Sequence, residues 1–385
     1  MKLARTDIIV IGGGAMGTAT GWALARQGHR VLVLEQFDHV HDKGSHGGQT
    51  RIFRHAYAEG PRYVPWTLEA DRLWTELQER TARRFMYRVG CLDISGPGFH
   101  RAREARASAD AYGIGSEWLT GTEVNERWPA WTLPEDRDVC FGPDAGFLDV
   151  PIALRALARE LADAGGEICA NEPVRSWSAD GGGVTVETAK GTYLADRLVL
   201  TAGAWSGKIL NELGIPLEVR RKPVVWFEID RNHRKSVSPE QFPVFISDDE
   251  TGEFYGIPEY GEPGIKVGMH SGGDVVDPDQ IDRTASESDI APDLRPFVKR
   301  SIRGATGRTM NAVVCMYTMT PDTDFVIDRH PDHPNVALAT GFSGHGFKFA
   351  PVVGEYLATL VTDPTARVRP DFSLSRFAEL PLAGD

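Results

Sequence analysis

The sequence predicts two domains: an α/β FAD- or NAD-binding domain of Rossmann type, and a second α+β domain with a mainly antiparallel sheet. The first prediction rests on residues 6–36, where an apolar strand, a glycine-rich turn, a helix and a second apolar strand follow one another. The second rests on residues 219–320, where short strands with alternating apolar positions replace that pattern. The chain has 385 residues, which is long enough for both domains.

The glycine-rich turn has the spacing G-x-G-x-x-G, and each glycine has a physical reason to be there. Gly12 allows the tight turn, Gly14 lets the backbone approach a pyrophosphate, and Gly17 lets the helix pack closely against the strand. Ala15 and Met16 begin the helix, whose unpaired N–H groups attract the same pyrophosphate. This turn therefore predicts a dinucleotide-binding site.

Glu35 ends the second strand, where a carboxylate can accept hydrogen bonds from the hydroxyls of the adenosine ribose, and Gln36 follows it. The motif itself fits either FAD or NAD. Its position near the N-terminus of a long chain favours FAD.

The composition and charge disfavour several classes of binding partner and of site. A formal charge of −12 and a pI near 5.4 disfavour binding to nucleic acid or to anionic membranes. No apolar run approaches the roughly 20 residues that a membrane span needs. Neither a disulfide framework nor a metal site is indicated by the spacing of the four cysteines, Cys91, Cys140, Cys169 and Cys315. We expect a cytoplasmic enzyme. We also expect no metal, because His39, His41 and His46 have no carboxylates or thiols near them at the spacing of metal ligands.

Residues 37–65 read as an irregular polar segment that contains the sequence GSHGGQTRIFRHAY (44–57). Its two arginines, Arg51 and Arg54, stand beside small residues that let the backbone approach a ligand. This pattern favours contact with an anion or a cofactor. The alternative is a solvated basic loop.

Helical spacing and strand patterns place the remaining elements. An amphipathic helix carries Trp66, Trp74 and Leu77 on one face, and another opens at Asp149 and ends before the glycines at 165 and 166. Strands are expected at 183–188, 192–194, 197–201, 224–229, 253–260, 264–270 and 336–340, and a closing helix at about 351–362.

Several polar residues interrupt these later apolar strands. Lys266, Tyr255 and His270 stand among apolar neighbours, and a lysine on a half-buried strand is costly unless it has a partner or a task. Considered alone, Lys266 also fits an outward-facing position, and Cys315 fits a buried structural thiol.

Five segments taken together resemble one known family. They are GGGAMG (12–17), GSHGGQTRIFRHAY (44–57), FYGIPEYGEPGIKVGMH (254–270), CMYTMTPDTDFVIDRHP (315–331) and GFSGHGFKF (341–349). In this order and over nearly the whole length, the chain resembles the monomeric sarcosine oxidase and N-methyltryptophan oxidase family. These are flavin amine oxidases of the D-amino-acid-oxidase-like superfamily.

The resemblance implies FAD as the cofactor, held covalently by a thioether between Cys315 and the 8α carbon of the flavin. It implies that Lys266 activates O2 on one side of the flavin and that Arg51 lies on the other face. The residues expected to bind the cofactor are Gly12, Gly14, Ala15, Met16, Gly17, Glu35, Gln36, Ser45, Thr50, Arg51, Val174, Cys315, Met316, Gly344, Gly346, Phe347 and Lys348.

For the substrate, the resemblance implies that Arg54 and Lys348 clamp a carboxylate. The side chains implied to line the reactive cavity are Tyr255, His270, Tyr317 and His345. The pattern departs at Ile257, where sarcosine oxidases carry a phenylalanine, and Ile246 occupies a neighbouring pocket position. An aliphatic side chain there changes the shape of the pocket, which opens the question of strict specificity for sarcosine.

The function predicted from these residues is oxidation of sarcosine or another N-methyl amino acid by O2, giving formaldehyde, the primary amino acid and H2O2. Alternatives are an oxidase of cyclic imino acids such as pipecolate or proline, and an amine dehydrogenase with another electron acceptor. The remaining alternatives for the function are an NAD-dependent enzyme and a non-catalytic flavin-binding protein. We expect a monomer whose partners are the small amino-acid substrate and O2. The expected FAD-binding domain comprises residues 1–90, 146–218 and 321–385, and the substrate domain comprises 91–145 and 219–320.

Overall fold

The computed structural model describes residues 2–377, and a parallel sheet forms the centre of its first half. The order of this six-stranded sheet is β10 (Glu167–Cys169), β3 (Val31–Leu34), β2 (Ile8–Ile11), β14 (Arg197–Leu200), β21 (Val336–Thr340) and β20 (Val326–Arg329). All neighbours are parallel except β20, which runs antiparallel to β21. The βαβ unit expected over residues 6–36 is confirmed, with helix α1 (Ala15–Arg26) between β2 and β3.

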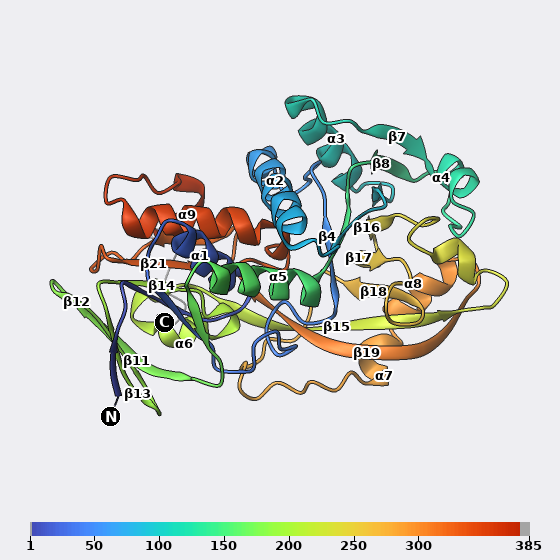
Figure 1. The fold of residues 1–385 in the computed structure, drawn as a ribbon. Coiled ribbons are helices and arrows are strands. Elements are labelled where there is room, and N and C mark those ends of the chain that lie inside the picture. Colours follow the sequence, from blue (N-terminus) through green and yellow to red (C-terminus); the bar gives the residue numbers. More distant parts are fainter. Residues whose placement is uncertain (1, 378–385) are drawn as a thin grey trace.

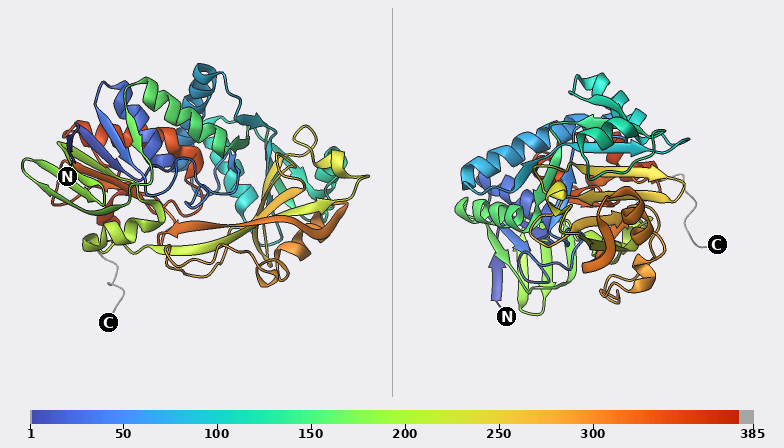
Figure 2. Two further views of the ribbon diagram at one scale, coloured as in Figure 1. Left: turned by 60° about the horizontal axis from the view of Figure 1, so that its bottom comes forward. Right: turned by 90° about the vertical axis from the view of Figure 1, so that its right-hand side faces the viewer.

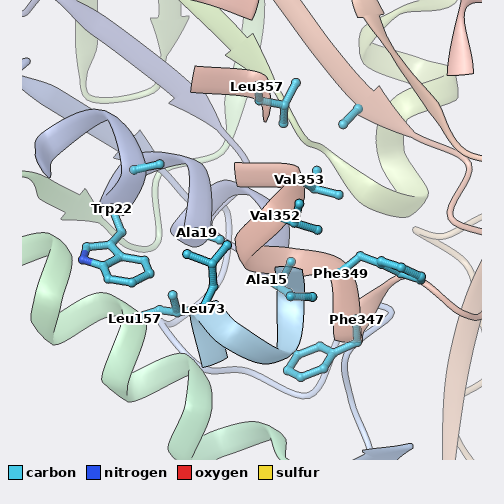
Figure 3. Close-up of a cluster of buried hydrophobic side chains, with 14 of the residues drawn as sticks. Ala15, Ala19, Trp22, Leu73, Leu157, Phe347, Phe349, Val352, Val353 and Leu357 are labelled. Carbon is cyan, nitrogen blue, oxygen red and sulfur yellow. The ribbon is translucent and has the colours of Figure 1, made fainter. Parts of the chain in front are cut away.

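Helices cover one face of this sheet, as Figures 1 and 2 show. These are α1, α2 (Val64–Thr81), α5 (Val150–Asp163) and α9 (Ala350–Thr362). Figure 3 shows their shared core, in which Trp22 of α1, Leu73 of α2, Leu157 of α5 and Val353 of α9 come together. The predicted start of α5 is also confirmed, because the carboxylate of Asp149 accepts a hydrogen bond from the N–H of Ile152.

A small sheet covers the opposite face. Its order is β1 (Lys2–Arg5), β13 (Gly191–Ala195), β12 (Gly183–Thr188) and β11 (Val174–Asp180). The side chains of β2 are buried on both faces of the parallel sheet. Ile8 and Val10 pack with the helices, while Ile9 and Ile11 pack with the small sheet. A strand buried on both faces reads as a continuous apolar run, which is why residues 8–11 were recognisable from the sequence.

An eight-stranded sheet forms the second half of the molecule. Its order is β19 (Ala305–Met319), β15 (Glu218–Ile229), β18 (Ile265–Met269), β17 (Gly252–Ile257), β16 (Val244–Asp249), β6 (Cys91–Ser95), β8 (Asp138–Gly142) and β7 (Glu117–Thr120). Only the pair of β16 and β6 is parallel. The long strands β15 and β19 run along the side away from α2 (Figure 1). The mainly antiparallel second sheet is therefore confirmed.

Shorter elements complete the fold. The remaining helices are α3 (Arg101–Tyr112), α4 (Gly121–Arg127), α6 (Ser206–Ile209), α7 (Glu287–Ile290) and α8 (Leu294–Ser301). Single 3-10 turns are η1 (Pro61–Tyr63), η2 (Gly203–Trp205), η3 (Asn211–Leu213), η4 (Arg234–Val237), η5 (Phe347–Phe349), η6 (Pro370–Phe372) and η7 (Leu374–Phe377). Within residues 2–377, the helices are all too short or too polar to cross a bilayer.

Two boundary predictions are wrong. Residues 37–65 were expected to be irregular, but β4 (Thr50–Phe53) lies within them and forms a three-stranded sheet with β9 (Gly146–Asp149) and β5 (Met86–Arg88). The strand expected over 253–260 ends at Ile257, because Pro258 follows and has no N–H to donate to a neighbouring strand.

Candidate active site: an elongated cavity between the two large sheets

A cavity of about 480 Å³ lies between the carboxyl ends of the parallel strands and the inner face of the eight-stranded sheet. Its wall includes the turns after β2, β3 and β14, the loop from Gly44 to Glu59, and parts of β16, β17 and β19. The size suits a ligand, and the carboxyl edge of an open parallel sheet is where such folds bind nucleotides.

Most of the residues predicted from the sequence lie in this wall. The exceptions are Gly17, Lys266 and Cys315, which stand one layer behind it. Gly17 packs against the turn itself, while Lys266 contacts Thr50 and Cys315 contacts Arg51, and both of these partners line the cavity.

The glycine-rich turn leaves room for a phosphate. Gly12 has a φ of 98°, which favours glycine, and a Cβ on Gly17 would stand 1.7 Å from the carbonyl oxygen of Gly12. A Cβ on Gly14 would instead meet protein only at 3.6 Å, at the ring of His46. The space in front of Gly14 is thus open on the cavity side, and α1 begins there without a side-chain cap. This cradle fits the pyrophosphate of a dinucleotide.

Glu35 is buried where β3 ends. Its carboxylate accepts hydrogen bonds from the N–H of Gly13 at 2.7 Å and the N–H of Phe37 at 2.9 Å. Burial alone raises the pKa of Glu35, but His41 and these two N–H groups outweigh it and lower the pKa overall. The side chain is therefore ionised at neutral pH and presents acceptor oxygens to the cavity, as binding of ribose hydroxyls requires.

Arg51, Lys266 and Cys315 meet at the middle of the cavity although they come from three different strands. The Nη2 of Arg51 lies 3.2 Å from the Sγ of Cys315 and donates to the carbonyl of Ser45 at 2.9 Å. The Nζ of Lys266 donates to the carbonyl of Thr50 at 2.8 Å and to its hydroxyl at 3.0 Å. A guanidinium, a lysine amine and a thiol are thus held together beside the cavity wall.

Lys266 is only 1% exposed. Burial, with a further contribution from Arg51, lowers its pKa well below the usual range. Its register partners on the eight-stranded sheet are Trp226 and Ile257. The outward-facing alternative for Lys266 is therefore wrong, because the side chain points into the molecule.

Arg54, in another part of the cavity wall, is already paired. Its Nη2 lies 2.6 Å from both carboxylate oxygens of Glu59, and its Nη1 donates to the carbonyl of Ala56 at 2.9 Å. Arg54 is only 2% exposed, and burial of an unpaired guanidinium would be costly. One guanidinium nitrogen of Arg54 thus holds Glu59 and the other holds a main-chain carbonyl, whereas its buried Nε has no hydrogen-bond partner among the described residues.

Lys348 lies beside Arg54 in a chain of hydrogen bonds. Its Nζ donates to the carbonyl of His345 at 2.7 Å and to the hydroxyl of Tyr57 at 3.1 Å. The same hydroxyl donates to the Nδ1 of His345 at 2.7 Å, and the Nε2 of that ring donates to the carbonyl of Thr323 at 3.1 Å. Burial, together with the charge of Arg54, lowers the pKa of Lys348 to about 7.

The aromatic and aliphatic residues predicted for the reactive cavity also lie in its wall. They are Tyr255, Tyr317, His270, Ile246 and Ile257. The rings of His270 and Tyr317 are 5.2 Å apart between centroids. Burial raises the pKa of Tyr255 to about 12 and lowers the pKa of His270, so both groups are neutral at pH 7.

The sequence reasoning missed four carboxylates in the wall: Glu59, Glu253, Glu172 and Asp279. Glu253 is on β17, two residues before Tyr255 and four before Ile257, and the alternation of a strand places all three on one face. That spacing was readable in the sequence. Glu59 follows β4 in a loop without a periodic pattern and gave no comparable signal.

Comparisons with known proteins agree with this geometry. A family model described as FAD dependent oxidoreductase matches residues 7–360. Monomeric sarcosine oxidase of Bacillus sp. (strain NS-129) is 42% identical over 382 residues, with 97% of each chain covered. N-methyl-L-tryptophan oxidase of Salmonella agona (strain SL483) is 34% identical over 379 residues, covering 97% of this chain and 100% of the relative.

Among solved structures, the open form of NikD matches with a TM-score of 0.83 at 25% identity, covering 95% of this chain and 96% of the other. It is described as an unusual amino acid oxidase essential for nikkomycin biosynthesis. The open phosphate cradle, the ionised Glu35 and the matched length of the family model lead to one assignment. The chain belongs to the family of FAD-dependent oxidoreductases, within its flavin-dependent amine oxidases.

Proposed function

We propose that this protein oxidises the secondary amine of an N-methyl amino acid with O2, giving formaldehyde, the primary amino acid and H2O2. The observation that carries the proposal is that Arg54 and Lys348 stand together in the wall of the cavity, while Arg51 and Lys266 lie beside it next to Cys315 and Thr50. The names of the relatives at 34–42% identity support the substrate class.

The cofactor we assign to this cavity is FAD, with Gly12, Gly14 and Glu35 holding its dinucleotide part and Cys315 as the point of covalent attachment. The chemistry that FAD supplies when bound is acceptance of a hydride equivalent from the carbon next to nitrogen, and delivery of the electrons to O2. The protein's own residues bind, orient and exclude water.

In this proposal, Arg54 and Lys348 bind the substrate carboxylate. Glu59 already holds the Nη2 of Arg54, so the substrate carboxylate either shares this guanidinium through its unpartnered Nε or displaces Glu59. Nearby cations favour the uncharged form of the substrate amine, and only this form can release a hydride. Lys266, in a site with little water, stabilises the negative charge that develops on oxygen.

The first test is the mass of the intact chain. Protein made in cells with ample flavin should carry the additional mass of FAD and stay yellow after acid precipitation, and a Cys315→Ala protein should lose the added mass. A chain of unmodified mass would remove the covalent part of the proposal, and a colourless protein would favour an NAD enzyme.

The second test separates an oxidase from a dehydrogenase. In a Lys266→Met protein we expect reoxidation by O2 to slow by orders of magnitude, while anaerobic reduction by an N-methyl amino acid changes far less. If both half-reactions slow equally, Lys266 has no special task toward O2. A yellow protein that no amine bleaches would be a non-catalytic flavin-binding protein.

We propose three further properties of this protein. We infer a monomer from the similarity to monomeric sarcosine oxidases, and a cytoplasmic location from the acidic composition and the scattered cysteines. We also propose the domain division into residues 1–90, 146–218 and 321–385 on one side and 91–145 and 219–320 on the other. The segments of the two large sheets follow that division.

A further inference from the structure

We propose that residues 271–286, which lead from β18 of the eight-stranded sheet to α7, form a strap across the adenosine end of the cavity, and that FAD enters where the middle of this strap opens. In Figure 1 the strap is the loop that leads into α7 below β15 and β19. This route rests on the assignment of FAD to the cavity made above. Buried side chains hold the two ends of the strap, whereas exposed ones fasten its middle.

The adenosine end of the cavity is the part of its wall around Glu35, to which the ribose hydroxyls are assigned. Phe37, two residues further on, lies edge-on to Trp205, with 5.5 Å between the ring centroids. The indole N–H of Trp205 donates to the carboxylate of Asp279, in the middle of the strap, at 2.6 Å. Phe37, Trp205 and Asp279 all line the cavity, so the strap completes the wall at this end.

Lys222 holds the start of the strap. This residue of β15 is only 2% exposed, and its Nζ donates to the carbonyls of Ser271 at 2.7 Å and Gly272 at 2.8 Å. The backbone N–H of Arg221 donates to the carbonyl of Asp274 at 2.9 Å. Pulling this end away would leave a buried amine without its acceptors, which is costly.

The side chain of Arg221 holds the other end of the strap. Arg221 is 8% exposed, and its guanidinium donates to the carbonyls of Asp282 at 2.8 Å and Thr284 at 2.7 Å. Between these two, Arg283 donates to the carbonyl of Lys43, in the loop after β3, at 2.9 Å. Both ends of the strap are therefore anchored to neighbouring residues of one strand, β15.

The middle of the strap, residues 277–281, is fastened to the nucleotide-binding half by exposed groups. Lys208, on α6, pairs with Asp277 at 2.6 Å and also with Asp279, and these three side chains are 46%, 40% and 55% exposed. Pro278 is buried between the two aspartates, so the strap lies against the protein. Exposed ion pairs contribute little to stability and weaken with salt. The middle can therefore separate from α6 while both ends stay in place.

The experiment measures how fast FAD enters and leaves a Cys315→Ala protein, in which no covalent bond holds the cofactor. Fluorescence of FAD reports its association with the stripped protein and its release on dilution. In Cys315→Ala with Lys208→Met we expect both rates to rise by at least about threefold, because two exposed ion pairs are lost. The Kd for FAD should stay nearly the same, because a strap that is open more of the time speeds entry and exit by one factor.

Salt and a control variant assign the effect to the ion pairs. The ratio of the rates with and without Lys208→Met should fall toward one as NaCl is raised, and effects of salt on FAD itself cancel in this ratio. Arg103→Met, on α3, also removes one positive charge and an exposed ion pair, with Asp138, and should leave both rates unchanged. Cys315→Ser provides the same measurements if Cys315→Ala does not fold.

Each outcome decides between the possibilities. Unchanged rates in Lys208→Met would overturn the strap as the route of entry. Faster release with unchanged association, and hence weaker binding, would also overturn it, because Lys208 would then be a direct contact of the cofactor. Failure of both Cys315 variants to bind any FAD would overturn the assignment of FAD to the cavity, and this inference with it.

Discussion

Arg54 is the residue on which the proposed binding of the substrate depends most directly. Its guanidinium, which is only 2% exposed, has Glu59 as a carboxylate partner inside the protein, so the side chain is held in place before substrate arrives. Replacement by alanine removes a bidentate, charge-assisted contact. We expect Arg54→Ala to raise the apparent Kd of the best amino-acid substrate by at least about 30-fold, or about 2 kcal/mol.

The measurement is anaerobic titration followed by flavin absorbance, and Arg72→Ala, on the exposed face of α2, is the matched control. Arg54→Lys should recover only part of the affinity, because an ammonium cannot form two parallel hydrogen bonds in the plane of a carboxylate. Unchanged affinity in Arg54→Ala would show that the clamp lies elsewhere.

The low pKa of Lys348 predicts how binding depends on pH. Burial lowers this pKa to about 7, so the side chain is charged below pH 7 and neutral above it. Binding of a carboxylate favours the charged form, and the affinity for a simple carboxylate without an amine, such as propionate, should therefore fall as the pH rises above 7.

Titration of the holoenzyme with propionate between pH 6 and 9 checks this expectation. The dissociation constant should increase by up to about tenfold per pH unit above 7. In Lys348→Met it should be higher and nearly independent of pH over the same range. A pH dependence that persists in this variant would have to come from another group.

At the scale of an element, two glycines of the turn between β2 and α1, Gly14 and Gly17, have different roles. A Cβ on Gly17 would meet the carbonyl oxygen of Gly12 at 1.7 Å, whereas a Cβ on Gly14 would extend into the space assigned to the phosphates. We expect Gly17→Ala to destabilise the fold by about 3 kcal/mol or more, and Gly14→Ala to fold but lose FAD. Urea unfolding of the cofactor-free proteins, and absorbance of the purified ones, provide the two readouts.

A Gly14→Ala protein that retains a full complement of flavin would contradict the assignment of the cradle. A Gly17→Ala protein as stable as the unsubstituted one would show instead that the close packing of helix and strand has room to adjust.

The elements that could be predicted are those with local causes. The strand at 8–11 is a continuous apolar run, and α5 begins at a capping aspartate, so neither needs knowledge of distant residues. The strand at 50–53 was missed because its ladder is formed with β9, almost a hundred residues further along the chain. Its own four residues, TRIF, are too few to show a period.

The candidate site likewise contains parts that local sequence predicts and parts that depend on contacts between distant residues. The phosphate cradle and Glu35 follow from one βαβ unit and were expected from residues alone. That Arg51, Lys266 and Cys315 come together results from contacts between three distant strands, and only the family resemblance anticipated it. Glu59 was missed because its partner Arg54 was read as a free clamp, and Glu253 was missed although the alternation with Tyr255 pointed to it.

At the scale of the whole molecule, the cavity joins two separate hydrophobic cores. One core lies between the parallel sheet and its helices, and the other lies behind the eight-stranded sheet. A ligand that contacts both walls stabilises both parts, and only in the folded state. We expect a Cys315→Ala protein stripped of FAD to melt at least about 5 °C below the same protein reconstituted with FAD.

Differential scanning calorimetry with increasing FAD is the measurement, and the unfolding of both cores should move to higher temperature together. If only one of two resolved transitions responds to FAD, the cofactor contacts a single wall, and the position assigned to it between the sheets is wrong.

The order of strands in the parallel sheet has a consequence for synthesis. β21, at residues 336–340, lies beside β14, and β14 lies beside β2 near the start of the chain. While residues 18–335 are made, a nascent chain on the ribosome therefore has its nucleotide turn but lacks the strand and the Gly344–Lys348 loop that complete the cavity. Capture of the flavin must therefore wait until residues 336–348 have emerged, long after the turn that binds its phosphates.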